Sequence, residues 1–361
     1  MYYAYVSYDP RNLIALVNDE ILKPKLPINT YDRIKSRTKL MLGEARSRGW
    51  ETQKVKDGTW IFLNNGKTVG GTVYHGPSTQ SMFARRVSND KQATKLTLQA
   101  NNVPTPNGQK FNSATKAEAL EYFKAQDRPV VVKPNGGTRG RGVSLNIKDT
   151  ETFEKAWSKA ADSGYGDEIV IEEYFAGFDI RVLVIGGRVR VACSRLNAFV
   201  VGDGKHTVQE LVDLELQRRL ADAYLKSTEI NIDEDWLAES PWTLEQVPEH
   251  GEVVVLNPIS SVGGGGFTLN VIDKISRQHI AVAERAARAF PGTGTVGVDI
   301  FTSSLQPDAD ITVLEINTQP FFDIHHYVSY GEPVNAASYI VDQIERTPVS
   351  YTHLTLPTSD L

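Results

Sequence analysis

The segment Val130–Val143, VVVKPNGGTRGRGV, places a lysine between a strand and a glycine-rich loop. Three consecutive β-branched residues favour a buried strand, and Pro134 ends it directly after Lys133. The glycines that follow can bring backbone N–H groups close to an anion, and they are Gly136, Gly137, Gly140 and Gly142. The segment therefore predicts a loop over nucleotide phosphates, with Lys133 reaching them from the strand.

Two familiar phosphate-binding motifs do not fit this spacing. In a P-loop the lysine follows the last glycine and precedes Ser or Thr, whereas Lys133 precedes the loop. A dinucleotide-binding fingerprint opens a helix, whereas Gly142 is followed by the strand-like residues 143–145. The alternative is a mobile glycine loop in which Arg139 and Arg141 are merely solvated.

Composition excludes several classes of partner. The 361 residues are 40% apolar and 23% charged, which is ordinary for a globular protein with two or three compact units. The net charge of −5 provides no general basic field for nucleic acid or anionic lipid. We therefore expect no nucleic-acid partner and no membrane partner, and a polyanionic ligand needs a local basic cluster.

The chain has a single cysteine and no recognisable leader. Cys193 alone excludes an intramolecular disulfide and a cysteine-based zinc site, and its apolar strand favours a buried structural thiol. The first residues lack a basic segment followed by an apolar stretch, and no apolar run is long enough to span a membrane. We expect a cytoplasmic protein.

Hydrophobic patterns and turn residues divide the chain into three parts. They predict a small α/β domain over residues 1–88, a larger domain over 89–347 and a tail over 348–361. The tail follows a natural helix end and resembles a translated sequencing adapter, so it is excluded from the fold argument.

Local signals place several elements. We predict helices over Tyr31–Arg48 and Lys91–Ala100 from apolar spacing and end signals. Capping boxes at Thr115-x-x-Glu118 and Thr207-x-x-Glu210 predict two further helix starts. Gly186-Gly187, between two apolar runs, predicts a two-residue hairpin.

A second polar cluster is expected on two later strands. Glu315 and Asn317 are two residues apart on a strand and therefore share a face, which Asp299 joins if its strand is the neighbour. These oxygen ligands suit Mg²⁺, and burying the acids in apolar strands is costly without a cation or donors. A structural salt bridge is the alternative.

An acidic strand end supplies a weaker signal. In IVIEEYFAGFDIRVLV, over 169–184, the strand ends near Glu172, Tyr174 and Phe175. Such a segment can present backbone groups to a purine, and Asp179 can accept from ribose hydroxyls. Acidic strand ends are, however, usually solvated.

In their order along the chain, these features resemble the ATP-grasp superfamily over roughly residues 89–345. The subgroup they resemble is the ATP-grasp domain of cyanophycin synthetase and of bifunctional glutamate–cysteine ligase/glutathione synthetase. RLNAFVVGDGKHTVQELV at Arg195–Val212, ISSVGG at Ile259–Gly264 and EINTQPFFDIHH at Glu315–His326 carry that likeness. It implies an α+β fold with two subdomains gripping ATP, preceded here by the small α/β domain.

The resemblance also implies roles for individual residues. Nucleotide binding falls to Lys91 and Lys133 on the phosphates, Gly137, Gly140 and Gly142 in the loop, Glu172, Tyr174 and Phe175 at adenine, and Asp179 at ribose. Asp299, Glu315 and Asn317 become the site of two Mg²⁺ ions, with Mn²⁺ as an alternative, and Arg181 and Arg195 lie near the reacting groups. Lys91 as an ordinary helix-start lysine, and His206 as a residue that orders its loop, are the plain alternatives.

The substrate loop departs from the family pattern. Leu256-Asn257-Pro258 stands where the family has an arginine, Val262 replaces a threonine, and Gly265 replaces an acidic residue. The resemblance implies carboxylate activation by ATP and attack by an amine, with an amino acid or short peptide as substrate and a possible homo-oligomer. A small-molecule kinase and a non-catalytic ATP-binding module are the alternatives.

Overall fold

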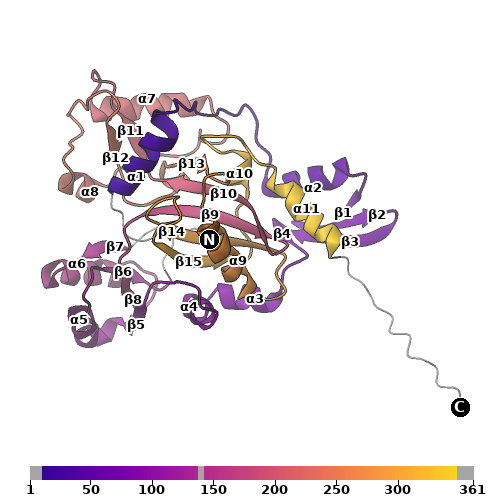
Figure 1. Ribbon diagram of the computed structural model, residues 1–361, viewed down its shortest axis with the longest axis horizontal. Coiled ribbons are helices and arrows are strands. Elements are labelled where there is room, and N and C mark those ends of the chain that lie inside the picture. The colour runs from indigo at the N-terminus through magenta and orange to yellow at the C-terminus, as the bar shows by residue number, and fades with distance from the viewer. Residues whose placement is uncertain (1–9, 137–141, 348–361) are drawn as a thin grey trace, which may run out of the picture.

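The computed structural model describes residues 10–136 and 142–347, and it arranges them as antiparallel sheets with surrounding helices (Figure 1). The predicted Gly137 and Gly140, with Arg139 and Arg141, lie outside the described residues, as does the tail. None of the helices within the described ranges is long and apolar enough to cross a membrane.

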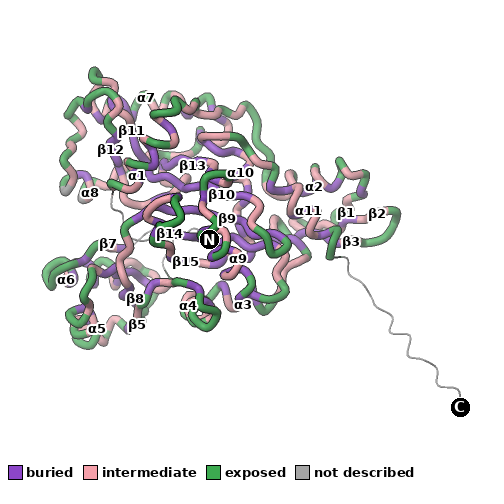
Figure 2. The backbone as a smooth tube through the Cα atoms, viewed as in Figure 1, coloured by how far each residue is buried: buried purple, intermediate pink, exposed green. Residues whose placement is uncertain are grey.

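The central sheet has the strand order β13-β10-β9-β14-β15, and every neighbouring pair is antiparallel. Its members and the helix that covers one face are β9 (Phe178–Ile185), β10 (Arg188–Leu196), β13 (Phe267–Asn270), β14 (Thr295–Thr302), β15 (Ile311–Asn317) and α9 (Arg277–Arg288). Its long strands β9, β10 and β14 are largely buried along their length (Figure 2).

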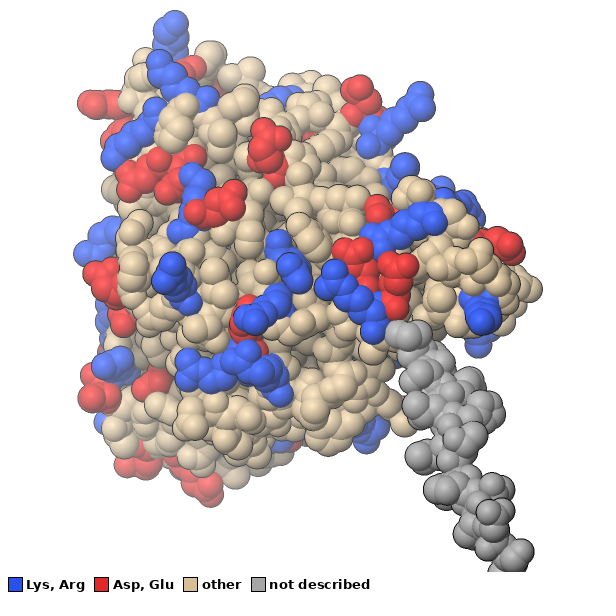
Figure 3. All heavy atoms as spheres, turned by 45° about the vertical axis from the view of Figure 1, so that its right-hand side comes forward, with Lys and Arg blue, Asp and Glu red and all other residues tan. Residues whose placement is uncertain are grey.

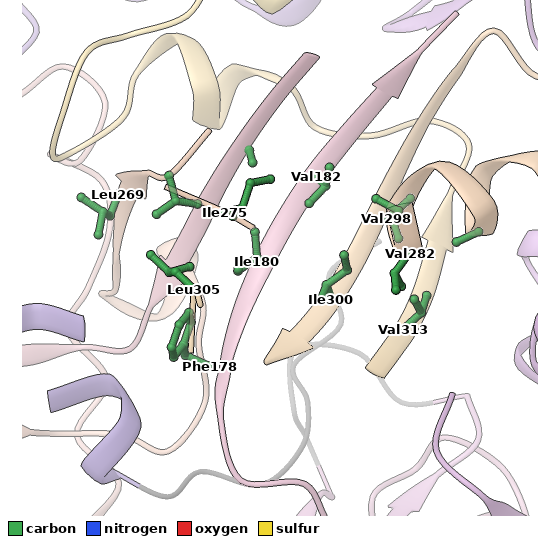
Figure 4. Packing of buried hydrophobic residues seen from close by; sticks show 14 of the residues in the cluster. Phe178, Ile180, Val182, Leu269, Ile275, Val282, Val298, Ile300, Leu305 and Val313 are labelled. Carbon is green, nitrogen blue, oxygen red and sulfur yellow. The ribbon is translucent and has the colours of Figure 1, made fainter. Parts of the chain in front are cut away.

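The two faces of this sheet differ in chemistry. Ile180 and Val182 of β9 pack in one cluster with Val282 of α9 (Figure 4). Because successive side chains on a strand alternate between faces, Asp179 and Arg181 lie on the opposite face. The apolar face therefore holds the core, and the other face carries buried charge.

A smaller sheet has the order β5-β8-β6-β7 and is covered by two helices. The elements are β5 (Gly108–Asn112), η2 (Ser113–Thr115), α5 (Lys116–Lys124), β6 (Val130–Pro134), β7 (Ser144–Ile147), α6 (Thr150–Ala161) and β8 (Glu168–Glu173). Phe123 of α5 and Phe153 of α6 stack with ring centroids 4.7 Å apart, which joins the helices over the sheet.

The first part of the chain forms a four-stranded meander beside two helices (Figure 1). The elements are α2 (Arg37–Ser47), β1 (Glu51–Lys56), β2 (Thr59–Asn64), β3 (Lys67–Val73), β4 (Gly76–Pro77) and the C-terminal α11 (Ala336–Arg346). Met41 and Phe62 share a buried cluster with Leu183 of β9 and Ile340 of α11. Packing thus continues across residue 88, and the domain division there stays a prediction.

The remaining elements complete the central core and the segment inserted after β10. They are α1 (Pro10–Val17), η1 (Asn18–Leu22), α3 (Met82–Ser88), α4 (Lys91–Ala100), β11 (Phe199–Val201), α7 (Val208–Leu220), α8 (Glu234–Glu239), β12 (Val253–Val255), η3 (Val262–Gly264) and α10 (Asp323–His326). Leu13 and Val17 of α1 pack in the core of the central sheet.

Several local predictions can be compared with the structure. The helix over Lys91–Ala100 and the Gly186-Gly187 hairpin are confirmed, and so is the capping box of Thr207 and Glu210. The helix predicted from Tyr31 begins only at Arg37. The helix start predicted at Thr115 is confirmed, since α5 runs over Lys116–Lys124 with Thr115 as its N-cap, but the capping box is not formed, because the Thr115 hydroxyl is bonded back to Asn112.

Candidate nucleotide and metal site

A pocket of about 40 Å³ lies where α4, the small sheet and β15 meet. Its wall contains four of the predicted site residues, Lys91, Lys133, Glu172 and Glu315. The remaining lining residues are Gln92, Lys95, Asn135, Val170 and Leu314. Residues far apart in the sequence therefore meet as the motif order suggested.

Glu172 is the centre of an ion-pair network in this pocket. Its carboxylate accepts from the ammonium of Lys133 on β6 and, at 3.2 Å, from that of Lys95 on α4. Lys91 Nζ donates to the backbone oxygen of Asn135 at 2.7 Å. Sequence reasoning missed Lys95, although the i,i+4 spacing from Lys91 places both on one face of the helix.

The surroundings of the pocket shift the pKa values of its lysines and of Glu172. Burial, and then the nearby Lys133, lower the pKa of Lys91 to about 8. Burial also lowers the pKa of Lys133, although Glu172 opposes the change. For Glu172 itself, burial raises the pKa of the carboxyl but is outweighed by Lys133 and Lys95, so the pKa falls to about 2. Three lysines thus share the pocket with two carboxyl groups, Glu172 and Glu315, an arrangement that favours a polyanionic ligand.

An apolar cluster lies between the small sheet and β15. Val131 and Val143 are its buried members, and Leu145, Tyr174 and Leu314 pack against them. The backbone N–H of Tyr174 is already bonded to the Pro129 oxygen at 2.9 Å, and the predicted Phe175 is half-buried. A flat aromatic group fits the chemistry of this lining.

Four charged residues form a lattice across the central sheet. Asp179 on β9 is paired in register with Arg195 on β10, and Asp299 on β14 is paired with Arg181 on β9. Both Arg195–Asp179 bonds are 2.6 Å long, and a third arginine bond reaches Asp299 at 2.9 Å. Arg181 holds both oxygens of Asp299. The two cations and two anions are mutually satisfied.

Glu315 stands next to this lattice without a donor. It pairs in register with Asp299, its side chain is half-buried, and its buried Oε2 atom has no hydrogen-bond partner among the described residues. Burial, followed by repulsion from Asp299, raises the pKa of Glu315 well above its ordinary value. An orphaned buried carboxylate oxygen is the kind of group that a divalent cation compensates.

Few side chains are available as ligands for a metal ion at this place. Within residues 10–136 and 142–347, no group of three or more His, Cys, Asp and Glu side chains is arranged to hold a metal ion. Asn317 completes the predicted set through an amide, whose Oδ1 accepts from the Gln319 N–H at 2.9 Å. Glu315 and Asn317 therefore fit a hard cation, while Asp299 already has two arginine partners.

Not every predicted residue lines the pocket. Asp179, predicted at ribose, is buried and both of its oxygens are held by Arg195. Arg181 and Arg195 are likewise part of the lattice rather than the pocket wall. Cys193, next to Arg181 in the cross-strand register, is the expected buried thiol, and burial raises its pKa to about 12.

Buried residues support the substrate loop that departs from the family pattern. Leu256 belongs to the tripeptide that stands where the family has an arginine, and it is fully buried. Arg219 of α7 is also buried, and it donates to the Gly265 oxygen at 2.7 Å. A side chain at Gly265 would approach the Ile230 Cα to 2.6 Å, and the residue has a φ of 96°, so glycine is required there. His206 bonds Asp203 at 2.6 Å within its loop.

Comparisons with known proteins agree with this geometry. Residues 89–195 match the family model described as the phosphoribosylglycinamide synthetase ATP-grasp (A) domain. A crystal structure of a bifunctional glutathione synthetase from Pasteurella multocida is similar with a TM-score of 0.65 and 24% identity, over 85% of this chain and 43% of that one. The expected ATP-grasp fold, with its mixed helices and antiparallel sheets, is therefore confirmed.

Two of the relatives that share sequence with this chain illustrate the match. Cyanophycin synthetase of Trichormus variabilis is 32% identical over 264 residues, which are 71% of this chain and 29% of the relative. The glutathione biosynthesis bifunctional protein GshAB of Streptococcus agalactiae is 31% identical over 255 residues, which are 67% of this chain and 33% of the relative. The resemblance stated from motifs is thus confirmed, and the chain spans about a third or less of these relatives.

Proposed function

We propose that this protein is an ATP-dependent carboxylate–amine ligase that acts on an amino acid or short peptide. The observation that carries the proposal is the lysine-rich pocket beside Glu315, whose buried Oε2 atom has no donor among the described residues. Three lysines against Glu172 suit polyphosphate, and Glu315 suits the cation that accompanies it. One of the relatives named above is called cyanophycin synthetase and the other a glutathione biosynthesis bifunctional protein, which supports a bond-forming reaction.

The residues of this chain have separable tasks in that reaction. Lys91, Lys95 and Lys133 bind and orient the phosphates, and the apolar cluster around Val131 and Tyr174 receives the adenine. Bound ATP supplies a phosphoryl group that converts a substrate carboxylate into an acyl phosphate, which an amine then displaces as an amide. Arg181 and Arg195 stabilise charge that develops on the transferred oxygens, and the loop after Lys133 excludes water.

Magnesium has a proposed place in the same scheme. Glu315 and Asn317 would hold it together with one oxygen of Asp299, and it would neutralise phosphate charge. Placing Asp179 at ribose and Glu172 at adenine rests on the resemblance alone. The division into domains at residue 88, a homo-oligomeric state and a cytoplasmic location are further proposals of the same kind.

A single assay tests the function. Purified protein is incubated with ATP, Mg²⁺ and pooled amino acids and dipeptides, and phosphate release and product mass are followed. We expect substrate-dependent ADP and free phosphate together with an amide product. A stable phosphorylated product would instead establish a kinase, and ATP binding without substrate-dependent ADP would establish a non-catalytic module.

A further inference from the structure

Phe321 joins the N-terminal meander to the segment that follows the proposed metal residues. The Arg37 guanidinium lies over its ring, 3.5 Å from the centroid. The His75 ring approaches it edge-on at 5.1 Å, and His75 Nε2 lies 3.2 Å from the Gln319 oxygen. Residues from α2 and from the loop between β3 and β4 thus meet a segment that begins directly after Asn317.

The Arg37 guanidinium has more N–H donors than it uses in contacts with the described residues. Among the described residues its one polar contact runs from Nη1 to Asp323 Oδ1 at 3.5 Å, which is long for a hydrogen bond. A guanidinium carries five N–H donors, and the Arg37 side chain keeps 25% of its exposure. The ring beneath it fixes its plane while its edges remain available.

Arg48, at the other end of α2, shows what a satisfied arginine looks like here. It bonds Glu44 at 3.0 Å, the Ser338 oxygen at 3.0 Å and Asp342 at 2.6 Å. It therefore has a structural role between α2 and α11. The comparison indicates that Arg37 is not held by the fold in the same way.

The helix α10, which begins at Asp323, packs against β10, the strand that carries Arg195 of the lattice. Burial raises the pKa of Asp323, and the nearby Arg37 opposes the change. His325 is buried, and its Nε2 atom has no partner among the described residues. A cation and an anion thus lie side by side at the start of a helix that packs on the strand of Arg195.

We infer that Arg37 and Asp323 form the subsite for the charged end of a free amino acid, with Arg37 taking its carboxylate and Asp323 its ammonium. This inference rests on the proposed function and names the class of the amine-supplying substrate. A planar guanidinium matches two carboxylate oxygens, which an ammonium of lysine cannot do. Exchanging the long Arg37–Asp323 contact for two zwitterion contacts keeps the charge balanced.

A binding experiment tests the subsite without requiring turnover. Protein loaded with a non-hydrolysable ATP analogue and Mg²⁺ is screened by saturation-transfer NMR against pooled free amino acids and against their α-amides, and the best acid is titrated by calorimetry. We expect an acid to bind, and its amide and the Arg37→Ala variant to bind roughly 10- to 100-fold more weakly, the range for charged hydrogen bonds. Arg37→Lys should be intermediate.

The matched control is Arg46→Ala, on the same helix, whose side chain bonds only the Thr52 hydroxyl among the residues that the structure describes. The Arg46→Ala variant should bind the amino acid like wild type, and Asp323→Asn should bind it more weakly. Equal affinity of the wild type and Arg37→Ala, or no acid bound by wild type, would overturn the subsite. If Arg37→Ala still forms ADP in the presence of an amino acid, with an unchanged KM for that amino acid, the ligase function is supported and the subsite is refuted. If binding depends on Arg37 but no ADP forms, the subsite is supported and the ligase function is refuted.

Discussion

The lysine pocket and the arginine lattice are two buried charge clusters with opposite designs. In the lattice, Arg181 and Arg195 are matched by Asp179 and Asp299 through paired bonds across neighbouring strands. In the pocket, three lysines line a cavity that they share with two carboxyl groups, Glu172 and Glu315, and only Glu172 is bonded to lysines. A matched cluster stabilises itself, whereas an unmatched one needs a ligand. We infer that the lattice serves as framework in the absence of ligand, where Arg181 and Arg195 are already paired, and that the pocket is the part that needs a ligand.

The largest effect should come from Glu315, which lies between the two clusters. Glu315→Gln removes the carboxylate proposed for the cation but keeps its shape, so we expect ADP formation to fall by at least roughly 10²- to 10³-fold. Because the buried Oε2 atom of Glu315 has no donor among the described residues, the melting temperature should not fall. A coupled ADP assay and circular dichroism measure the two quantities, and undiminished turnover would refute the metal assignment.

Substitutions within the lattice should strongly lower the free energy of unfolding. Asp299→Asn leaves the buried Arg181 without its counter-charge, and we expect a loss of about 3–5 kcal/mol in the free energy of unfolding. The exposed Lys110–Glu168 pair is the control, since Lys110→Ala should cost no more than about 1 kcal/mol. Urea denaturation compares them. Similar small losses for both would mean that the lattice is not framework.

Lys95 tests whether the pocket works as a unit. Lys95→Met removes one of two lysines on Glu172, so we expect ATP affinity to fall by roughly tenfold, the effect of one charge-assisted contact. Turnover at saturating ATP should change less. Steady-state kinetics separates KM from kcat. A variant with an unaltered KM for ATP would assign Lys95 a purely structural role.

The smallest expected effect is the uptake of protons when nucleotide binds. Because the pKa of Lys91 is lowered to about 8 from 10.5, part of the unliganded protein carries neutral Lys91 above pH 8. An anion raises that pKa again, so nucleotide binding should take up protons between pH 8 and 10.5, and affinity should fall as pH rises through 8. Calorimetry of ADP binding in two buffers of different ionisation enthalpy measures the uptake. Lys91→Arg should abolish it.

Sequence reasoning succeeded where spacing within an element decides the geometry. Glu315 and Asn317 share a strand as predicted, and Lys133 lies near the end of another, whereas their role in a site stays a prediction. It failed where a distant segment competes. The helix expected from Tyr31 starts late because residues 28–36 instead cross the segment after α10, where Tyr31 donates to the Val328 oxygen and Lys35 N–H to the Tyr327 hydroxyl.

Other parts of the site had no local signal. Arg37 and His75 meet Phe321 only in the fold, and nothing near them in the sequence predicts it. The matched state of the lattice was also invisible, because cross-strand register across β10, β9 and β14 depends on the whole sheet. Basic and acidic side chains are interspersed on the face seen in Figure 3, and the absence of a nucleic-acid partner that net charge suggested stays a prediction.

The central claim is that the surplus charge of the pocket selects a polyphosphate. Calorimetric titration of ATP and of AMP, each with Mg²⁺, into wild type and Lys133→Met tests it most directly. We expect wild type to bind ATP at least roughly 100-fold more tightly than AMP, and Lys133→Met to lose most of that preference. Equal affinities for the two nucleotides, or an undiminished preference in Lys133→Met, would contradict the claim.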